Sequence, residues 1–209
     1  MNPENVLEVL DVAKSFGRHP VLKDVTFCVQ PGQIVGITGE NGAGKSTLLK
    51  IIVGWISPDS GQVIKKVATG YCPQDLSIFE TLTIEENFAY FGAAYGLGNG
   101  NLPGSWKAKK EWLLKRFRFE TYEKTLVSHL SGGTKQKLNF SLAVLHSPLL
   151  LILDEPYSGF DWETYVHFWD YAEEMKSNGA GILIVSHFVY DRSKFDAVFE
   201  LKGGILQCA

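Results

Sequence analysis

The sequence predicts an α/β fold with a mostly parallel sheet built around a phosphate-binding loop. Three observations support this prediction. Residues 39–46 form a G-x-x-x-x-G-K-S pattern between an apolar run and a helix-like segment. Strand-like and helix-like segments alternate along much of the chain. The runs at 149–153 and 182–185 are almost wholly apolar, as is typical of strands buried on both faces of a parallel sheet.

The first part of the chain predicts an antiparallel β subdomain and the strand that leads into the loop. Residues 5–12 and 21–30 alternate apolar and polar side chains, as half-buried strands do. Residues 33–38 form the strand before the loop. Residues 57–61 have the composition of a turn, and residues 62–72 form one or two short strands.

A helical lobe is expected from about residue 76 to about residue 145. One helix begins at Thr83, where Thr-Ile-Glu-Glu has capping-box spacing. A glycine-rich break at 96–104 precedes a second helix over 106–118. Ser131 is expected to cap a further helix.

The rest of the chain returns to strand–helix alternation. A helix over 162–177 follows the strand at 149–153, and residues 198–207 form a hairpin after the strand at 182–185. We therefore expect all of 1–209 to form a single domain with the lobe inserted into it.

Composition excludes some functions. The net charge of −3 gives no indication of nucleic-acid binding. The three cysteines are far apart and form no C-x-x-C pair, which is typical of reduced thiols in a cytosolic protein. The first residues lack a basic and an apolar segment, so we expect no signal peptide. The apolar runs are too short to span a membrane, so any membrane role depends on a partner.

The glycine-rich loop has the chemistry of a phosphate site. Its glycines let backbone N–H groups face an anion, and the helix starting near Ser46 adds the positive end of its dipole. Lys45 supplies a cation to the outer phosphates, and the Ser46 hydroxyl is a ligand for Mg²⁺. An ordinary glycine-rich turn is the alternative. The nucleotide-binding residues expected here are Gly39, Asn41, Gly42, Gly44, Lys45, Ser46 and Thr47.

Two further motifs carry chemistry. Asp154 and Glu155 follow an apolar run, where Asp154 can hold Mg²⁺ and Glu155 can deprotonate an attacking water. A pair of solvated loop acids is the alternative. Ser131-Gly132-Gly133 opens a predicted helix and forms a second anion site. Two phosphate-binding helix ends in one chain suggest that two chains share each nucleotide.

With these motifs in order, the sequence resembles the ATP-binding cassette (ABC) family of transporter ATPases. Gln74 matches the glutamine that links Mg²⁺ and the attacking water to the helical lobe. Residues 158–161 match the loop that crosses the dimer interface, and His187 matches the switch histidine. Phe16 lies where the family places an aromatic ring against adenine. The resemblance covers roughly residues 6–207.

The resemblance implies an ATPase that uses ATP and Mg²⁺. The residues it implies to be catalytic are Glu155, His187, Gln74 and Lys45. Those implied to hold the metal are Ser46, Gln74 and Asp154. Those added to the ATP-binding set are Phe16, Ser131, Gly132 and Gly133.

The sequence departs from the family pattern without losing a catalytic group. Residues 131–134 match the family's signature motif, but Thr134 stands at its fifth position, where glutamine is commonest. Tyr157 stands where a threonine is usual after the acidic pair. Basic residues are frequent in 107–118. We interpret them as a solvated helix face, with contact to lipid headgroups as the alternative.

The resemblance implies that two cassettes close on two Mg·ATP and drive a separate membrane permease. Residues 82–97 look like those of two-component exporters of drugs, antibiotics or polysaccharides. An importer cassette, a non-transport ATP switch and an ATP-binding module without catalysis are the alternatives. The second cassette is either another copy of this chain or a different cassette chain. No nucleic acid is expected as a partner. The expected location is cytoplasmic, at the inner face of the cell membrane through the permease.

Overall fold

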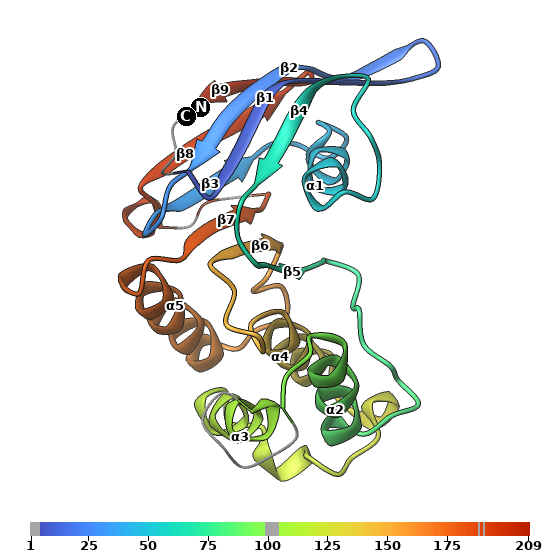
Figure 1. Cartoon of the computed structure of the whole chain (residues 1–209), viewed down its shortest axis with the longest axis vertical. Helices are drawn as coiled ribbons and strands as arrows, with labels where there is room; N and C mark the ends of the chain where they lie inside the picture. The colour runs from blue at the N-terminus through green and yellow to red at the C-terminus, as the bar shows by residue number, and fades with distance from the viewer. Residues whose placement is uncertain (1–4, 99–104, 188, 190) are drawn as a thin grey trace. The chain divides into compact units, whose positions relative to one another are not determined.

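The computed structural model describes residues 5–98, 105–187, 189 and 191–209 (Figure 1). These residues fall into two compact units. The first comprises residues up to Tyr71 together with Leu149–Glu155 and Glu174–Ala209. The second comprises Cys72–Pro148 and Pro156–Glu173. The second unit takes in all of the expected helical lobe and adds the segment after Glu155. That 1–209 acts as a single cassette domain stays a prediction.

The first unit contains a three-stranded antiparallel sheet in the order β2-β1-β4, as the alternating pattern predicts (Figure 1). Its strands are β1 (Leu7–Phe16), β2 (His19–Val29) and β4 (Ser60–Lys65). Phe16 lies between the two segments predicted as strands, 5–12 and 21–30, but β1 extends further than predicted, so Phe16 is its last residue and pairs with His19. The chain can turn this tightly because Gly17 adopts a φ of 62°, which glycine reaches without strain.

A six-stranded sheet, in the order β5-β6-β7-β3-β8-β9, contains the predicted parallel strands. Strands β6, β7, β3 and β8 pair in parallel, and β9 closes the predicted hairpin with β8. The six strands are β3 (Ile34–Thr38), β5 (Thr69–Cys72), β6 (Leu150–Asp154), β7 (Gly181–Val185), β8 (Ala197–Lys202) and β9 (Ile205–Cys208). All residues of β6 and β7 are buried, which explains why their sequences are almost wholly apolar.

Helix α1 (Lys45–Val53) belongs to the core of the first unit. Leu48, Leu49 and Ile52 lie on this helix and are fully buried in one cluster with side chains of both sheets. Each such side chain contributes about 1.5–3 kcal/mol to folding. This packing holds the start of α1, and therefore the loop before it, in place.

The second unit is helical, as predicted. Its helices are α2 (Ile84–Ala94), α3 (Trp106–Arg116), α4 (Gly132–Ala143) and the first part of α5 (Trp162–Ser177), with short 3₁₀ turns η1 (Glu120–Tyr122) and η2 (Val127–His129). A third such turn, η3 (Arg192–Lys194), lies in the first unit. Both predicted caps are present, because Thr83 forms a capping box with Glu86 and Ser131 caps α4.

Some expectations fall outside the described residues. They are most of the break at 96–104 and the N-terminal residues on which the absence of a signal peptide rests. No helix of the described residues is long and apolar enough to cross a membrane.

The basic residues of α3 do not form a simply solvated face. Lys110 is 4% exposed and forms an ion pair with Glu123 and a longer one, 3.6 Å, with Glu85. The Lys109 ammonium lies 4.9 Å from the centre of the Trp112 ring. Long lysine stems pack well against aromatic surface while their charges find partners. The prediction of a solvated face is therefore wrong for these two lysines.

Candidate active site

The phosphate loop connects β3 to α1 in the first unit. Its glycines are required by geometry. A Cβ on Gly39 would lie 2.4 Å from the Leu201 carbonyl oxygen, and Gly44 precedes the helix with a φ of 105°. Gly44 provides no side-chain cap, so the first N–H groups of α1 have no capping side chain. These amides and the helix dipole suit an anion.

Lys45, the first residue of α1, points back into this loop. Its side chain is buried, and its ammonium donates to the carbonyl oxygens of Gly39 and Glu40, the latter at 3.1 Å. Burial lowers the pKa of Lys45, and the negative charges of Glu155 and Asp154 partly oppose that shift. The structure thus holds a poorly hydrated cation within the loop, where a phosphate can pair with it.

The acidic pair lies where β6 ends. Asp154 is the last residue of the strand and is 8% exposed. Glu155 has a φ of 48°, an unfavourable conformation for a residue with a side chain, and its N–H donates to the Val185 carbonyl at 2.9 Å. Backbone strain of about 1–3 kcal/mol is commonly found at functional sites, where the surrounding structure enforces it.

Three of the four predicted catalytic residues meet in the first unit. The Lys45 ammonium lies 3.4 Å from His187 Nδ1. His187 Nε2 lies 3.7 Å from Glu155 Oε1, and the Ser186 hydroxyl donates to Glu155 Oε2 at 2.8 Å. A cation, an imidazole, a carboxylate and a hydroxyl thus form one chain of contacts beside the phosphate loop.

The other predicted residues belong to the second unit. Gln74, the fourth predicted catalytic residue, is exposed and directly follows Pro73. The Ser131 hydroxyl accepts from the Thr134 N–H at 3.3 Å and lies 3.0 Å from the Thr134 hydroxyl. Within this unit, a Cβ on Gly133 would lie 3.0 Å from the Gly159 carbonyl oxygen. The signature and the predicted interface loop are therefore neighbours.

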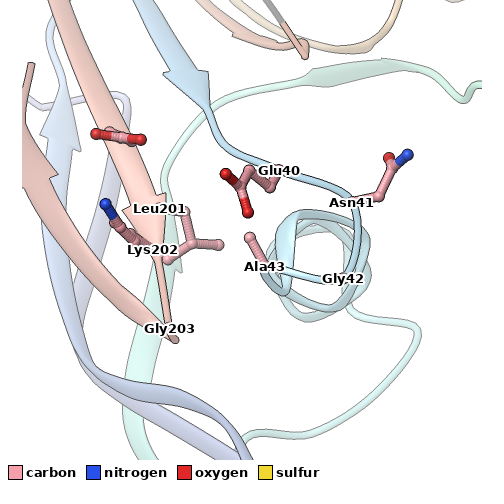
Figure 2. A pocket seen from close by; sticks show the side chains of 8 residues that line it. Glu40, Asn41, Gly42, Ala43, Leu201, Lys202 and Gly203 are labelled. Atoms are coloured by element: carbon pink, nitrogen blue, oxygen red, sulfur yellow. The ribbon is translucent and has the colours of Figure 1, made fainter.

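Several residues around the loop were not predicted. A hollow of about 210 Å³ separates the loop from the end of β8 (Figure 2). Figure 2 shows the Glu40 side chain directed into this space from the loop. The residues that line it are Glu40, Asn41, Gly42, Ala43, Glu200, Leu201, Lys202 and Gly203. The four from β8 and its turn carry no motif, so only the parallel pairing of β3 with β8 reveals them.

The oxygen donors present fit a magnesium ion. Ser46 is exposed in the first turn of α1, and the Asp154 carboxylate ends β6. The described residues hold no group of three or more His, Cys, Asp or Glu side chains placed to bind a metal. Mg²⁺ in phosphate sites needs no such group, because one or two protein oxygens, phosphates and waters complete its shell.

Comparison with known proteins identifies the family. A family model described as ABC transporter matches residues 22–158. The chain is 33% identical over 213 residues to the ABC-type transporter ATP-binding protein EcsA of Bacillus subtilis, covering 96% of this chain and 85% of EcsA. It is 31% identical over 218 residues to the Nod factor export ATP-binding protein I of Bradyrhizobium diazoefficiens, covering 98% and 70% of the two chains.

A solved structure described as an ATP-binding subunit of an ABC transporter superimposes with a TM-score of 0.89 at 32% identity, covering 96% of this chain and 88% of that one. The chain therefore belongs to the ABC transporter family, whose cassettes bind ATP and hydrolyse it for transport. The fold and the family expected from the motifs are confirmed. The chain spans only 28% and 62% of the length of two other curated relatives.

Proposed function

We propose that this chain hydrolyses Mg·ATP to power a separate membrane permease. The observation that carries the proposal is the chain of contacts from Lys45 through His187 to Glu155 beside the phosphate loop. A fold alone would not specify hydrolysis, because function depends on the groups placed in the site. Here a cation, an oriented carboxylate and an imidazole are all in place.

Each side chain has a distinct role in this proposal. The start of α1 and Lys45 bind the β- and γ-phosphates. Ser46, Asp154 and Gln74 hold Mg²⁺, which neutralises phosphate charge when it is bound. Water attacks the γ-phosphorus, the bond to the bridging oxygen breaks, and the water proton passes to Glu155. His187, which lies 3.7 Å from Glu155 and 3.4 Å from the Lys45 ammonium, orients Glu155 and shares the γ-phosphate with Lys45 in this proposal.

We also propose that two cassettes share each nucleotide. Ser131-Gly132-Gly133 starts α4 with a hydroxyl and backbone amides, and these groups suit the γ-phosphate bound to the opposite chain.

A relative named as a Nod factor export protein, together with the resemblance of residues 82–97, favours export. The cassette then works at the cytoplasmic face of the membrane.

An exposed aromatic surface on the second unit suits the permease. Phe79, Tyr90 and Tyr95 are 41%, 54% and 38% exposed, and rings contact one another from Phe79 through Phe91 to Tyr95. Clustered exposed rings mark binding surfaces. A membrane protein that copurifies with the wild-type chain and is lost from a Tyr90→Ala variant would support this partner.

The Glu155→Gln variant tests the catalytic proposal. The amide keeps the shape of the side chain but accepts no proton, so turnover should fall by about 10²–10⁴-fold while ATP still binds. Steady-state phosphate release and nucleotide titration measure the two properties separately. Wild-type turnover in this variant would remove Glu155 from the role of general base.

A further inference from the structure

We propose that Ser186 is a positioning residue that selects which oxygen of Glu155 takes the proton from water. The inference rests on the proposed function, in which Glu155 is the general base. It concerns a residue that contacts neither nucleotide nor metal in that proposal. The observation behind it is that the two oxygens of the Glu155 carboxylate have different surroundings.

One oxygen is held by a hydrogen bond. The Ser186 hydroxyl donates to Glu155 Oε2 at 2.8 Å. A hydrogen bond to an ionised carboxylate is roughly twice as strong as one between neutral groups. Glu155 Oε2 therefore has one of its lone pairs occupied by a donor.

The other oxygen is left available. Glu155 Oε1 is buried, has no hydrogen-bond partner among the residues that the structure describes, and lies 3.7 Å from His187 Nε2. A buried acceptor without a donor is costly and is rarely retained without a reason. An oxygen that must accept a proton from water during the reaction needs a free lone pair, and Oε1 has one.

Ser186 is itself rigidly placed. It follows directly on β7, is 4% exposed, and its N–H donates to the Ile37 carbonyl at 3.0 Å. Strand β7 therefore fixes its backbone against β3, the strand that leads into the phosphate loop. The Ser186 hydroxyl thus holds the Glu155 carboxylate in a fixed position relative to β3, the strand that also positions the phosphate loop.

A glutamate carboxylate needs this support because its last torsion is soft. Rotation about that bond has a broad, roughly two-fold preference, so an unsupported carboxylate samples many orientations. The backbone of Glu155 is already fixed at a φ of 48° by its bond to Val185. The Ser186 hydroxyl restrains the last torsion of the Glu155 side chain. A misplaced base lowers the rate of turnover without weakening the binding of the substrate.

The Ser186→Ala variant tests the proposal by separating rate from binding. We expect kcat to fall by about 10- to 100-fold, because a hydrogen bond to a charged group is lost. KM for ATP and the affinity for a non-hydrolysable ATP analogue should change less than about twofold. The Ser186→Thr variant keeps the hydroxyl and should restore most of kcat.

Ser141→Ala is the matched control. Ser141 is also fully buried, but within the described part of the chain its hydroxyl has no hydrogen-bond partner. Its removal deletes a buried oxygen without releasing a carboxylate, so kcat should remain at the wild-type value. If Ser186→Ala folds poorly, Ser186→Cys provides the same comparison, since a thiol of similar shape is a weak donor and should give an intermediate kcat.

The double variant with Glu155→Gln shows whether Ser186 acts through Glu155. Once the base is removed, Ser186→Ala should lower the residual turnover no further. An equal loss with and without Glu155, or wild-type kcat in Ser186→Ala, would overturn the inference. If Glu155→Gln itself turns over normally, the proposed function fails instead, so the two failures are distinguishable.

Discussion

The ring of Phe16 is exposed to solvent rather than buried in the core. The side chain is 53% exposed at the end of β1, which rules out a core role. The Lys14 ammonium lies 5.8 Å from the ring centre and also donates to Asp59 at 2.7 Å. Asp59 accepts the Ser15 N–H at 2.7 Å as well, so the backbone beside Phe16 is anchored. An exposed ring on a fixed backbone is suited to stack on a purine.

We predict that Phe16→Ala weakens ATP and GTP binding equally. Stacking on a base contributes about 1–3 kcal/mol and tolerates any purine, so both affinities should fall by roughly 5- to 150-fold. The phenyl ring has no group that reads a base edge, so the ATP-to-GTP ratio should stay constant. Calorimetric titration of both nucleotides measures this.

Trp55→Ala is the control for Phe16→Ala. Trp55 is 60% exposed in the same unit, and its ring packs on Tyr71 rather than beside the loop. Its loss should leave both affinities unchanged. A folded Phe16→Ala variant with wild-type affinities would leave the base without an assigned contact.

At the scale of single residues, the sequence predicts which side chains carry the chemistry better than it predicts which residues they contact. Lys45 and Glu155 could be named because their spacing from glycines and apolar runs is local, whereas His187 was named only through the resemblance to the ABC family. Asp59 could not be paired with Ser15, because 44 positions separate them and only the β1–β4 pairing brings them together. Ser186 had no signal either, since the direction of its hydroxyl depends on the fold around Glu155.

At the scale of elements, capping residues fix where the helices of the second unit begin. Thr83 accepts the Glu86 N–H at 3.2 Å, and Glu86 accepts the Thr83 N–H at 2.7 Å. The backbone bond from Thr83, and then the bond from its hydroxyl, lower the pKa of the Glu86 carboxyl. A carboxyl whose pKa is lower in the folded than in the unfolded chain stabilises the fold at pH values above the pKa of the unfolded chain. That stabilisation is lost as the pH falls through the pKa of the folded chain.

We predict that Thr83→Ala destabilises the chain by about 0.5–2 kcal/mol at neutral pH. The difference from wild type should shrink as the pH falls through the lowered pKa of Glu86, because the carboxyl then loses the charge that strengthens its hydrogen bonds with Thr83. Urea unfolding at several pH values measures it. Thr121→Ala removes an exposed threonine that caps no helix and should cost little. An equal loss in the two variants would argue against the capping box.

The kinds of elements follow from local patterns, but their order in the sheet does not. Capping spacing gave the start of α2, and apolar runs gave β6 and β7. The placement of β3 between β7 and β8 depends on pairings between distant segments, such as Ile34 with Ile182. The burial of Lys110 likewise depends on Glu123, which lies in a different turn of the unit.

At the scale of the whole molecule, the predicted reaction groups are divided between the two units. Lys45, Asp154, Glu155 and His187 belong to the first unit, whereas Gln74 and Ser131 belong to the second. The first unit therefore carries the groups proposed to bind and attack the phosphates. The second carries a helix start that the two-chain proposal assigns to the nucleotide of a partner.

We predict that Ser131→Arg, combined with Glu155→Gln, abolishes ATP-dependent dimers while leaving ATP binding to the single chain nearly intact. A bulky cation at the start of α4 opposes the helix dipole and fills the place of the phosphate, but it leaves the phosphate loop of its own chain unchanged. Size-exclusion chromatography with Mg·ATP measures dimers, and titration of the isolated chain measures binding.

The substitution also removes a helix cap, so a matched capping variant is needed to interpret it. Ser105 caps α3 through the Ala108 N–H at 3.4 Å, and Ser105→Ala in the same Glu155→Gln background loses a cap without touching the signature. This variant should still dimerise, because a lost cap costs only about 0.5–2 kcal/mol of stability. If Ser131→Arg lost ATP binding but kept the dimer, the assignment of Ser131 to the partner's nucleotide would be wrong. If both variants failed to dimerise, loosening of the helical unit, rather than a blocked phosphate contact, would explain the loss.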